Sequence, residues 1–586
     1  MLRTHTAGEL TKANVGQSIS LCGWVDQLRD IGQLVFLSLR DRYGVTQCVF
    51  ESANAEHPLL AKLKSLGHEF CVRVDGVVRM RSEKDINRSQ PSGEIEVVID
   101  ELTILNESCE LPFQVRDDVM AADDLRLKFR YLDLRRPKMQ RNLQIRHQVV
   151  QATREALSEL GFLEIETPML IRSTPEGARD FVVPSRLHPG KFYALPQSPQ
   201  LYKQMLMISG CDRYFQFAQA FRDEDLRADR VPVHTQIDME MSFVEEKDVF
   251  AAVEKYMSNI FMKVKGIKLD TPFHIMSYQE AMDRFGCDKP DTRFALELKT
   301  ITELAYKSSF GVFKDASCVR CLVVPNGESV TRKDLDGELA DAAKIYGAKG
   351  LAWTRVKEGS LSGGIGKFLS EIEKPLLSEI GAQEGALILF VAASYNRCCA
   401  ALSAVRLKLA AKLDLIDHSQ FNFLWVNDFP LFEWDEDRKA YNAMHHLFTM
   451  PKVEDIQYLD SDPGRVRGQL YDLVLNGVEL CSGSIRINRP EIQSQVIDIV
   501  GMPKEEAESK FGFLLESFKY GAPPHGGSAV GLDRLVAILC GESSIREVIA
   551  YPCNNVGVFP LDNSPAQLNP QQLGELKLSI NPSQDA

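Results

Sequence analysis

The chain has 586 residues, of which 44% are hydrophobic and 25% are charged, and this balance excludes a disordered or fibrous protein. A chain of this length exceeds what one hydrophobic core can hold and predicts roughly three or four domains. The formal net charge of −13 neither supports nor excludes RNA as a partner, because RNA is bound by local basic and aromatic surfaces.

Hydrophobic runs are short throughout the chain. The longest, residues 386–393 (ALILFVAA), is far below the ~20 residues that a membrane helix needs. The N-terminal residues carry no apolar stretch typical of a secretory signal, so we expect a cytoplasmic protein with no membrane partner. The 13 cysteines do not predict a disulfide framework. A lone CxxC at Cys318 and Cys321 lacks the further ligands that zinc requires, and we interpret these thiols as buried strand residues.

Short alternating segments fill residues 1–106. In the clearest one, Val35, Leu37 and Leu39 share one strand face, while Phe36 lies on the other. Five such strands and one helix near residues 58–66 predict a small closed barrel of the OB-fold type. An aromatic side chain on the polar face of such a barrel can stack on an RNA base, although a partly exposed strand aromatic is the alternative.

The remaining chain predicts a mixed α+β protein. A charged, irregular stretch after the barrel reads as a linker, and apolar spacing predicts a long helix over residues 142–160, ended by Gly161. A helix over 332–346 and a strand over 386–393 indicate an inserted α+β module. The predicted domains are a barrel at 1–106, a linker at 107–140, a larger α+β domain at 141–289 and 419–586, and the inserted domain at 290–418.

Three segments carry candidate chemistry, and each is weak alone. Residues 161–170 (GFLEIETPML) read as the end of a helix, a strand and a proline. Residues 221–243 (FRDEDLRADRVPVHTQIDMEMSF) place a dense charge cluster between two apolar strand halves, which predicts a hairpin that presents charge to one site. Residues 531–535 (GLDRL) open an apolar helix, where Arg534 would offer a planar donor to phosphate.

Together these segments resemble motifs 1, 2 and 3 of the class II aminoacyl-tRNA synthetases. Four further segments narrow the resemblance to the aspartyl-tRNA synthetases of the bacterial type: STPEGARDF at 173–181, YALPQSPQLYKQ at 193–204, AMHHLF at 443–448 and PPHGGSAVGLDR at 523–534. The resemblance covers nearly the whole chain. It implies an antiparallel-sheet catalytic domain of the class II type behind an OB-fold anticodon-binding domain.

The resemblance also implies a reaction and its partners. L-Aspartate would be activated with ATP to aspartyl-adenylate and then transferred to tRNA(Asp), with Mg2+ as cofactor and a homodimer joined through motif 1. Positioning and charge neutralisation would supply most of the acceleration. Arg222 and Arg534 would be catalytic, Arg222 at the α-phosphate and Arg534 at the far end of the triphosphate.

The same resemblance assigns the binding residues. The aspartate site would comprise Glu176, Ser198, Gln200, Lys203, Arg222, Asp238, His445 and Arg486, with Arg486 forking the side-chain carboxylate. The ATP site would comprise Arg222, Asp223, Glu224, Val231, His234, Glu479, Gly531, Leu532, Asp533 and Arg534. Magnesium would be held by Asp472 and Glu479, whose hard carboxylate oxygens suit it. The anticodon would be read by Arg29, Phe36, Gln47 and Glu94, which favours the stacking interpretation of Phe36.

The sequence departs from the family pattern in motif 2, where RQPEFTQ is usual and RVPVHTQ stands at 230–236. Val231 replaces a glutamine that contacts ATP, His234 replaces the phenylalanine that stacks on adenine, and Val233 removes a carboxylate. We expect weakened ATP affinity rather than inactivity. Cys481 and Ser482 also replace small residues, and the barrel loop lacks two arginines that often precede Arg29.

Two alternatives stay open. A non-discriminating enzyme would charge both tRNA(Asp) and tRNA(Asn) with aspartate, and here the aliphatic Ile31 slightly favours the discriminating form. An inactive paralogue that only binds RNA is suggested by the altered motif 2, but the retained arginines and carboxylates argue against it. Asparaginyl- and lysyl-tRNA synthetases share the barrel and the motifs, but they lack the inserted module.

Overall fold

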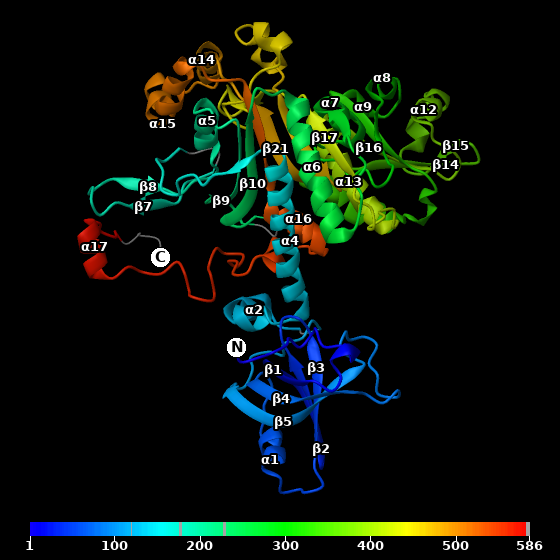
Figure 1. The fold of residues 1–586 in the computed structure, drawn as a ribbon. Helices are drawn as coiled ribbons and strands as arrows, with labels where there is room; N and C mark the ends of the chain where they lie inside the picture. Colours follow the sequence, from blue (N-terminus) through cyan, green and yellow to red (C-terminus); the bar gives the residue numbers. More distant parts are fainter. Residues whose placement is uncertain (119, 175–177, 227–229, 582–586) are drawn as a thin grey trace. The chain divides into compact units, whose positions relative to one another are not determined.

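The computed structural model describes residues 1–118, 120–174, 178–226 and 230–581 (Figure 1). The chain forms two compact units. The first comprises Met1–Gln144 with Arg546–Ala566, and the second comprises Ile145–Ile545 with Gln567–Ala586. The predicted OB-fold and the mixed α+β character are both confirmed, as the following elements show.

The first unit contains a closed five-stranded barrel with the order β1-β2-β3-β5-β4. Its elements are β1 (Ser18–Ile31), β2 (Leu34–Arg40), β3 (Val45–Glu51), α1 (Pro58–Lys64), β4 (Cys71–Met80) and β5 (Ile95–Asn106). Val35, Leu37 and Leu39 are fully buried in the barrel core, as the strand alternation predicts. Phe36 lies on the opposite face and is only partly buried.

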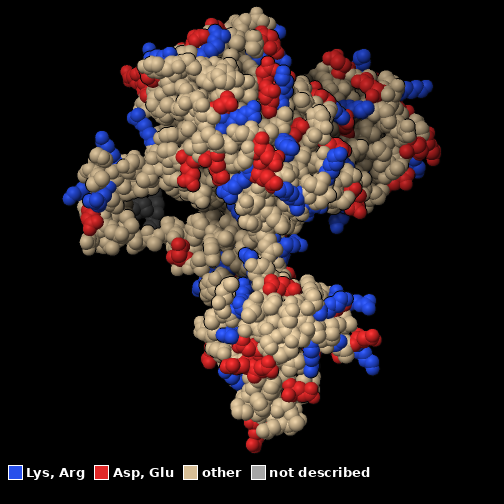
Figure 2. All heavy atoms as spheres, viewed as in Figure 1, with Lys and Arg blue, Asp and Glu red and all other residues tan. Residues whose placement is uncertain are grey.

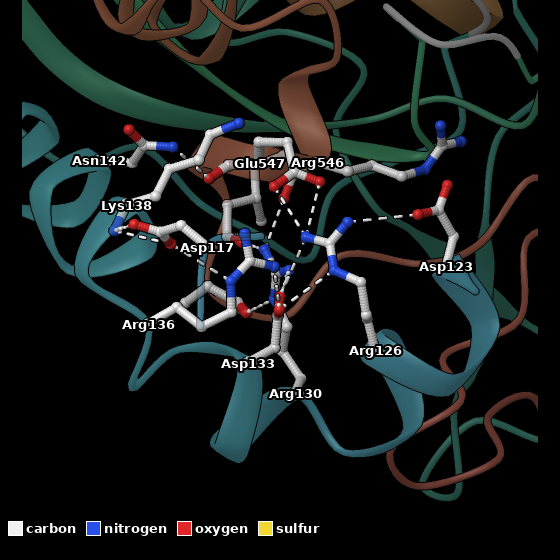
Figure 3. A network of polar contacts seen from close by, with 12 residues as sticks. Asp117, Asp123, Arg126, Arg130, Asp133, Arg136, Lys138, Asn142, Arg546 and Glu547 are labelled. Atoms are coloured by element: carbon white, nitrogen blue, oxygen red, sulfur yellow. Dashed lines mark hydrogen bonds and ion pairs between the residues drawn. The ribbon is translucent and has the colours of Figure 1, made fainter. Parts of the chain in front are cut away.

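The stretch after the barrel is more ordered than the predicted linker. It forms α2 (Asp123–Lys128), α3 (Arg130–Asp133) and the start of α4 (Pro137–Glu159). The long helix begins five residues earlier than predicted because a proline is well tolerated in the first turn. Figure 3 shows the polar network that organises this stretch around the buried carboxylate of Asp133. Three arginines contact that carboxylate: Arg130 at 2.6 Å, Arg136 at 2.7 Å and Arg126 at 3.1 Å.

An eight-stranded sheet dominates the second unit, with the order β11-β17-β20-β21-β22-β10-β9-β6. The strands are β6 (Leu163–Glu164), β9 (Arg213–Phe221), β10 (Val233–Ser242), β11 (His274–Ser277), β17 (Phe423–Asn427), β20 (Leu470–Leu475), β21 (Val478–Ile485) and β22 (His525–Gly531). The neighbours from β17 to β9 pair antiparallel, whereas the two outer pairs are parallel. The predicted hairpin of residues 221–243 is confirmed by the β9–β10 pair.

Helices and two small hairpins accompany this sheet. The helices are α5 (Gln200–Ile208), α6 (Glu246–Lys265), α7 (Tyr278–Phe285), α14 (Pro490–Ile499), α15 (Lys504–Ser517), α16 (Leu532–Cys540) and α17 (Pro570–Leu576). The hairpins are β7 (Val182–Pro184) with β8 (Phe192–Ala194), and β18 (Phe432–Asp435) with β19 (Ala440–Ala443). Helix α16 begins directly after β22, which confirms the predicted helix at GLDRL. Trp425 is fully buried between α6 and the sheet, where its ring stacks on Phe250 at 4.2 Å.

A second sheet, with the order β12-β13-β16-β14-β15, lies within the predicted inserted module. Its strands are β12 (Leu298–Thr300), β13 (Cys318–Val324), β14 (Ala352–Lys357), β15 (Ser360–Ser362) and β16 (Leu387–Ala393), and its helices are α8 (Thr302–Ala305), α9 (Gly311–Lys314), α10 (Arg332–Asp334), α11 (Ala340–Ile345), α12 (Glu373–Ile380) and α13 (Tyr395–Lys412). The predicted single helix over 332–346 is wrong. The helical segment is interrupted at Gly337, whose φ of −105° and ψ of −109° are not helical. Glycine can adopt these angles because it has no Cβ atom. Cys318 and Cys321 are buried in β13, as expected of strand thiols.

No helix within the described ranges is long and apolar enough to cross a membrane. Acidic and basic side chains are interspersed on the face drawn in Figure 2. The net charge of −13 is therefore not gathered there as a single acidic patch.

Candidate active site

A buried charge cluster forms where α5 meets β10 of the central sheet. Asp238 and Glu240 are two residues apart on β10, so their side chains point to the same face of the strand. They are 1% and 0% exposed. Lys203 of α5 reaches both carboxylates, with its Nζ 2.7 Å from Oδ1 of Asp238 and 3.2 Å from Oε2 of Glu240. The predicted pairing of Lys203 with Asp238 is therefore present.

Arg486, the residue directly after β21, joins this cluster through its guanidinium group. Nε lies 2.8 Å from Oε1 of Glu240, and Nη2 lies 3.1 Å from Oε2 of the same carboxylate. Nη1 additionally contacts Ser484 Oγ at 2.6 Å and His446 Nε2 at 2.9 Å. Burial alone would raise the pKa of Glu240, but the charges of Arg486 and Lys203 lower it to about 2.

The other predicted aspartate-site residues surround this cluster to different extents. Nε2 of Gln200 is buried and has no hydrogen-bond partner among the described residues, so it is available to a ligand. Ser198 Oγ accepts a hydrogen bond from the backbone N–H of Gln200 at 3.3 Å. His445 lies 3.2 Å from Ser482 Oγ through its Nδ1. Glu176 lies outside the described residues.

Motifs 2 and 3 bring three cationic or aromatic side chains together at the predicted ATP site. Burial, together with the neighbouring charges of Arg222 and Arg534, lowers the pKa of His234 to about 4. Nε of Arg222 is buried with no hydrogen-bond partner among the described residues, so this donor is available to an anionic ligand. Arg534 donates a hydrogen bond through Nη1 to the backbone carbonyl of Glu479.

Several predicted ATP-site residues have protein partners. Val231 is 5% exposed and packs in the core. Asp533, 3% exposed, pairs with Arg146 and accepts a hydrogen bond from the Thr235 amide at 2.8 Å, which gives its carboxylate a structural role. On the surface, Glu224 lies 3.6 Å from Arg230 and Asp223 lies 3.9 Å from Arg179. Gly531 ends β22 and Leu532 begins α16, next to Arg534.

The predicted magnesium ligands occupy neighbouring strands. Asp472 of β20 is 2% exposed, and its Oδ1 has no hydrogen-bond partner in the described part of the chain. Burial and the nearby charge of Glu479 on β21 raise the pKa of Asp472. Magnesium usually takes one or two carboxylates and completes its shell with water and phosphate, so this donor set is compatible with it. The described residues include no group of three or more His, Cys, Asp or Glu side chains that could hold a metal ion.

The predicted anticodon residues lie on the barrel. Arg29 and Phe36 are cross-strand partners on β1 and β2, and the guanidinium lies 5.5 Å from the centre of the ring. Gln47 donates a hydrogen bond to Glu96 at 2.8 Å. Glu94 is half exposed, 3.9 Å from Lys12. The arrangement offers a partly exposed ring beside a cation, which suits stacking on a single-stranded base.

Two residues of the cluster were absent from the predicted set. Glu240 follows Asp238 at a spacing of two on a strand, so the alternation could have placed it on the same face. His446 directly follows the predicted His445, and burial lowers its pKa, which keeps it neutral beside Arg486.

Comparisons with known proteins give a consistent result. A family model described as "tRNA synthetases class II (D, K and N)" matches residues 122–555, and one described as "OB-fold nucleic acid binding domain" matches residues 19–105. The chain is 50% identical to the aspartate–tRNA(Asp/Asn) ligase of Treponema denticola, over 99% of each chain. It is 48% identical to the aspartate–tRNA ligase of Ruminiclostridium cellulolyticum, over 99% of this chain and 98% of the relative.

Solved structures share the fold at low sequence identity. The asparaginyl-tRNA synthetase of Pyrococcus horikoshii, complexed with asparaginyl-adenylate, aligns with a TM-score of 0.60 and 18% identity, covering 97% of this chain and all of that one. The aspartyl-tRNA synthetase of Entamoeba histolytica aligns with a TM-score of 0.57 and 19% identity, covering 93% and 90%.

Proposed function

The chain belongs to the class II tRNA synthetases for aspartate, lysine and asparagine, and we propose that within this family it joins L-aspartate to tRNA with ATP. The observation that carries this assignment is the buried pair of cations, Lys203 and Arg486, at the predicted amino-acid pocket. Two buried cations beside one another suit a side chain that ends in a carboxylate. The side-chain NH2 group of asparagine would face these donors, so neither the NH2 group nor the protein donor opposite it would find a hydrogen-bond acceptor.

The reaction proceeds in two steps. An oxygen of the aspartate α-carboxylate attacks the α-phosphorus of ATP, and the bond to the leaving pyrophosphate breaks. A terminal ribose hydroxyl of the tRNA then attacks the aspartyl carbonyl carbon, and AMP leaves. Little covalent chemistry is required of the protein, so positioning and charge stabilisation dominate.

Arg222 is the residue best suited to the α-phosphate, because its Nε is buried and lacks a protein partner in the described structure. Arg534 orients the far phosphates, next to Glu479. Gln200 and Ser198 hold the α-amino end of aspartate through their oxygen atoms, which accept hydrogen bonds from the ammonium group. Asp472 and Glu479 would hold magnesium, which would neutralise part of the phosphate charge.

Pyrophosphate exchange into ATP tests the activation step without any tRNA. We expect exchange with aspartate and none with asparagine. An Arg486→Lys variant should lose most of this exchange, because an ammonium group cannot donate two parallel hydrogen bonds to one carboxylate. The assay is run at low temperature, where the variant should remain folded. Exchange that is absent from the wild-type enzyme would reject the assignment and favour an RNA-binding paralogue.

A second candidate is the relaxed enzyme that charges both tRNA(Asp) and tRNA(Asn), favoured by relatives whose names carry both substrates. Ile31, at the end of β1, is 64% exposed and available to an anticodon base. Charging of the two purified tRNAs decides between the candidates. If the wild type charges only tRNA(Asp), Ile31→His should raise charging of tRNA(Asn), whereas Ile31→Leu should not.

The active form is a homodimer joined through the motif 1 segment. Leu163, Met169 and Leu170 of that segment are 56%, 40% and 51% exposed, which is unusual for neighbouring apolar side chains unless a partner covers them. Sedimentation of the full chain tests this, with Leu170→Glu as the disrupting variant. The cytoplasm is the expected location, because aminoacylation serves protein synthesis.

A further inference from the structure

The segment that joins α7 to β12 carries a lysine to the acidic pair of the active site. Nζ of Lys289 lies 3.5 Å from Oε2 of Glu479 and 3.7 Å from Oδ2 of Asp288. None of the roles described above uses this lysine. Its position beside a predicted magnesium ligand therefore needs an explanation.

The backbone that follows Lys289 is fixed by two independent contacts. Arg406 of α13, 1% exposed, donates hydrogen bonds to the carbonyl oxygens of Asp291 and Leu296, both at 2.8 Å. Asp291 also packs against Gly477, where an added Cβ would lie only 3.0 Å from the Asp291 Cβ. Gly477 lies in the turn between β20 and β21, so the segment is held against the hairpin that carries Asp472 and Glu479.

The side chain of Lys289 keeps freedom that its backbone lacks. Pro290 follows it and disfavours helical backbone angles at Lys289. The side chain is 45% exposed, and its ammonium sits at the end of a flexible four-carbon stem. Lys289 can therefore leave Glu479 for another anion nearby without any movement of the backbone.

A second cation contacts the same glutamate. Arg534 donates to the backbone carbonyl of Glu479, whereas Lys289 pairs with its carboxylate. Magnesium held by Glu479 would engage its carboxylate, and the phosphates of bound ATP would bring new negative charge to the site. A cation placed there would meet charge that grows on the leaving pyrophosphate.

On the basis of the proposed function, we propose that Lys289 is a further nucleotide-site residue. In the free enzyme its ammonium pairs with Glu479. In the loaded enzyme it binds the β- and γ-phosphates of ATP and then the pyrophosphate. The segment that leads into the inserted module thereby contributes a residue to the active site, and Arg406 of that module holds the backbone that follows it.

Calorimetric binding of two ligands tests this role without turnover. The α,β-methylene analogue of ATP, with magnesium, carries the β- and γ-phosphates, whereas AMP lacks them. We expect Lys289→Gln to weaken binding of the analogue about tenfold and to leave AMP binding unchanged. Lys289→Arg should retain most of the affinity. Lys299→Gln, at an exposed lysine of β12, is the matched control and should bind both ligands as the wild type does.

Two outcomes would overturn the inference. One is unchanged binding of the analogue by Lys289→Gln. The other is equal weakening for the analogue and AMP, which would indicate a distorted site rather than a lost phosphate contact. Failure of the proposed function is distinguishable, because it would appear as absent aspartate-dependent exchange in the wild type whatever the nucleotide affinities of the variants.

Discussion

Glu240 holds Arg486 by two parallel contacts, from Nε to Oε1 at 2.8 Å and from Nη2 to Oε2 at 3.1 Å. The arginine that the aspartate side chain is expected to meet is thus oriented by the protein itself. Such preorganisation reduces the conformational entropy that the arginine side chain loses when aspartate binds. Glu240 acts through Arg486 and is a positioning residue.

Glu240→Gln should destabilise the protein by about 3–5 kcal/mol, because it leaves Arg486 buried with an incomplete counter-charge. The exposed pair of Arg489 and Glu491, 2.7 Å apart, is the matched control, and Glu491→Gln should leave the free energy of unfolding close to that of the wild type. Urea unfolding measures both. At temperatures where the variant stays folded, the KM for aspartate should rise more than the KM for ATP. Equal effects of the two substitutions on stability would contradict the role given to burial.

The same pair predicts a pH dependence. The pKa of Glu240 is lowered from 4.5 to about 2, so its ionised form contributes stability that is fully present above pH 4.5. That contribution is lost as the pH falls from about 4.5 through about 2. The difference in unfolding free energy between the wild type and Glu240→Gln should therefore shrink between pH 5 and pH 3. A constant difference over this range would exclude Glu240 as the titrating group.

His234 should lower the affinity of the nucleotide site for ATP. Its pKa of about 4 keeps it neutral at pH 6 to 8, so it can stack on adenine but offers less area than phenylalanine. We expect His234→Phe to lower the KM for ATP ~3- to 10-fold, which corresponds to ~0.5–1.5 kcal/mol. The KM for aspartate serves as the internal control and should not change. An unaltered KM for ATP would show that position 234 does not contact the base.

Local sequence patterns predicted the elements whose partners lie close in the chain. The strand period identified the barrel and the hairpin of β9 with β10, and the charge cluster identified the loop between them. The break at Gly337 was missed because a single glycine inside an apolar helical pattern does not reveal its backbone angles. The pairing of Arg486 with Glu240 spans 246 positions, and the contact of Lys289 with Glu479 depends on the packing of an inserted segment. No local period encodes such contacts.

Phe36 should matter for tRNA and not for activation. Removing the ring in Phe36→Ala loses one stacked base, worth ~1–3 kcal/mol, so tRNA affinity should fall about 5- to 150-fold. Pyrophosphate exchange should stay at the wild-type level, since that step needs no tRNA. Tyr43→Ala, at a half-exposed aromatic of the same barrel, is the control and should retain tRNA affinity. Equal losses in the two variants would assign the effect to general damage of the barrel.

Asp133 should stabilise the first unit more than any single surface charge does. Its fully buried carboxylate contacts Arg126, Arg130 and Arg136, and although burial would raise its pKa, these three guanidinium groups lower it (Figure 3). Asp133→Asn should cost about 3–5 kcal/mol, because three arginines lose their shared counter-charge.

 The control is Asp123→Asn, which removes an exposed partner of the same Arg126 at 3.3 Å and should cost less than about 1 kcal/mol.

Amide hydrogen exchange locates the loss that Asp133→Asn causes. Protection should fall in residues 123–142 and in residues 546–550, where Arg130 also donates hydrogen bonds to the carbonyl oxygens of Arg546, Ile549 and Ala550. Protection in the eight-stranded sheet should stay as in the wild type, since none of these contacts involves it. Equal amide protection in Asp133→Asn and Asp123→Asn would show that the buried carboxylate does not organise this network. The hydrogen bonds from Arg130 to the backbone would then be sufficient to keep these residues ordered.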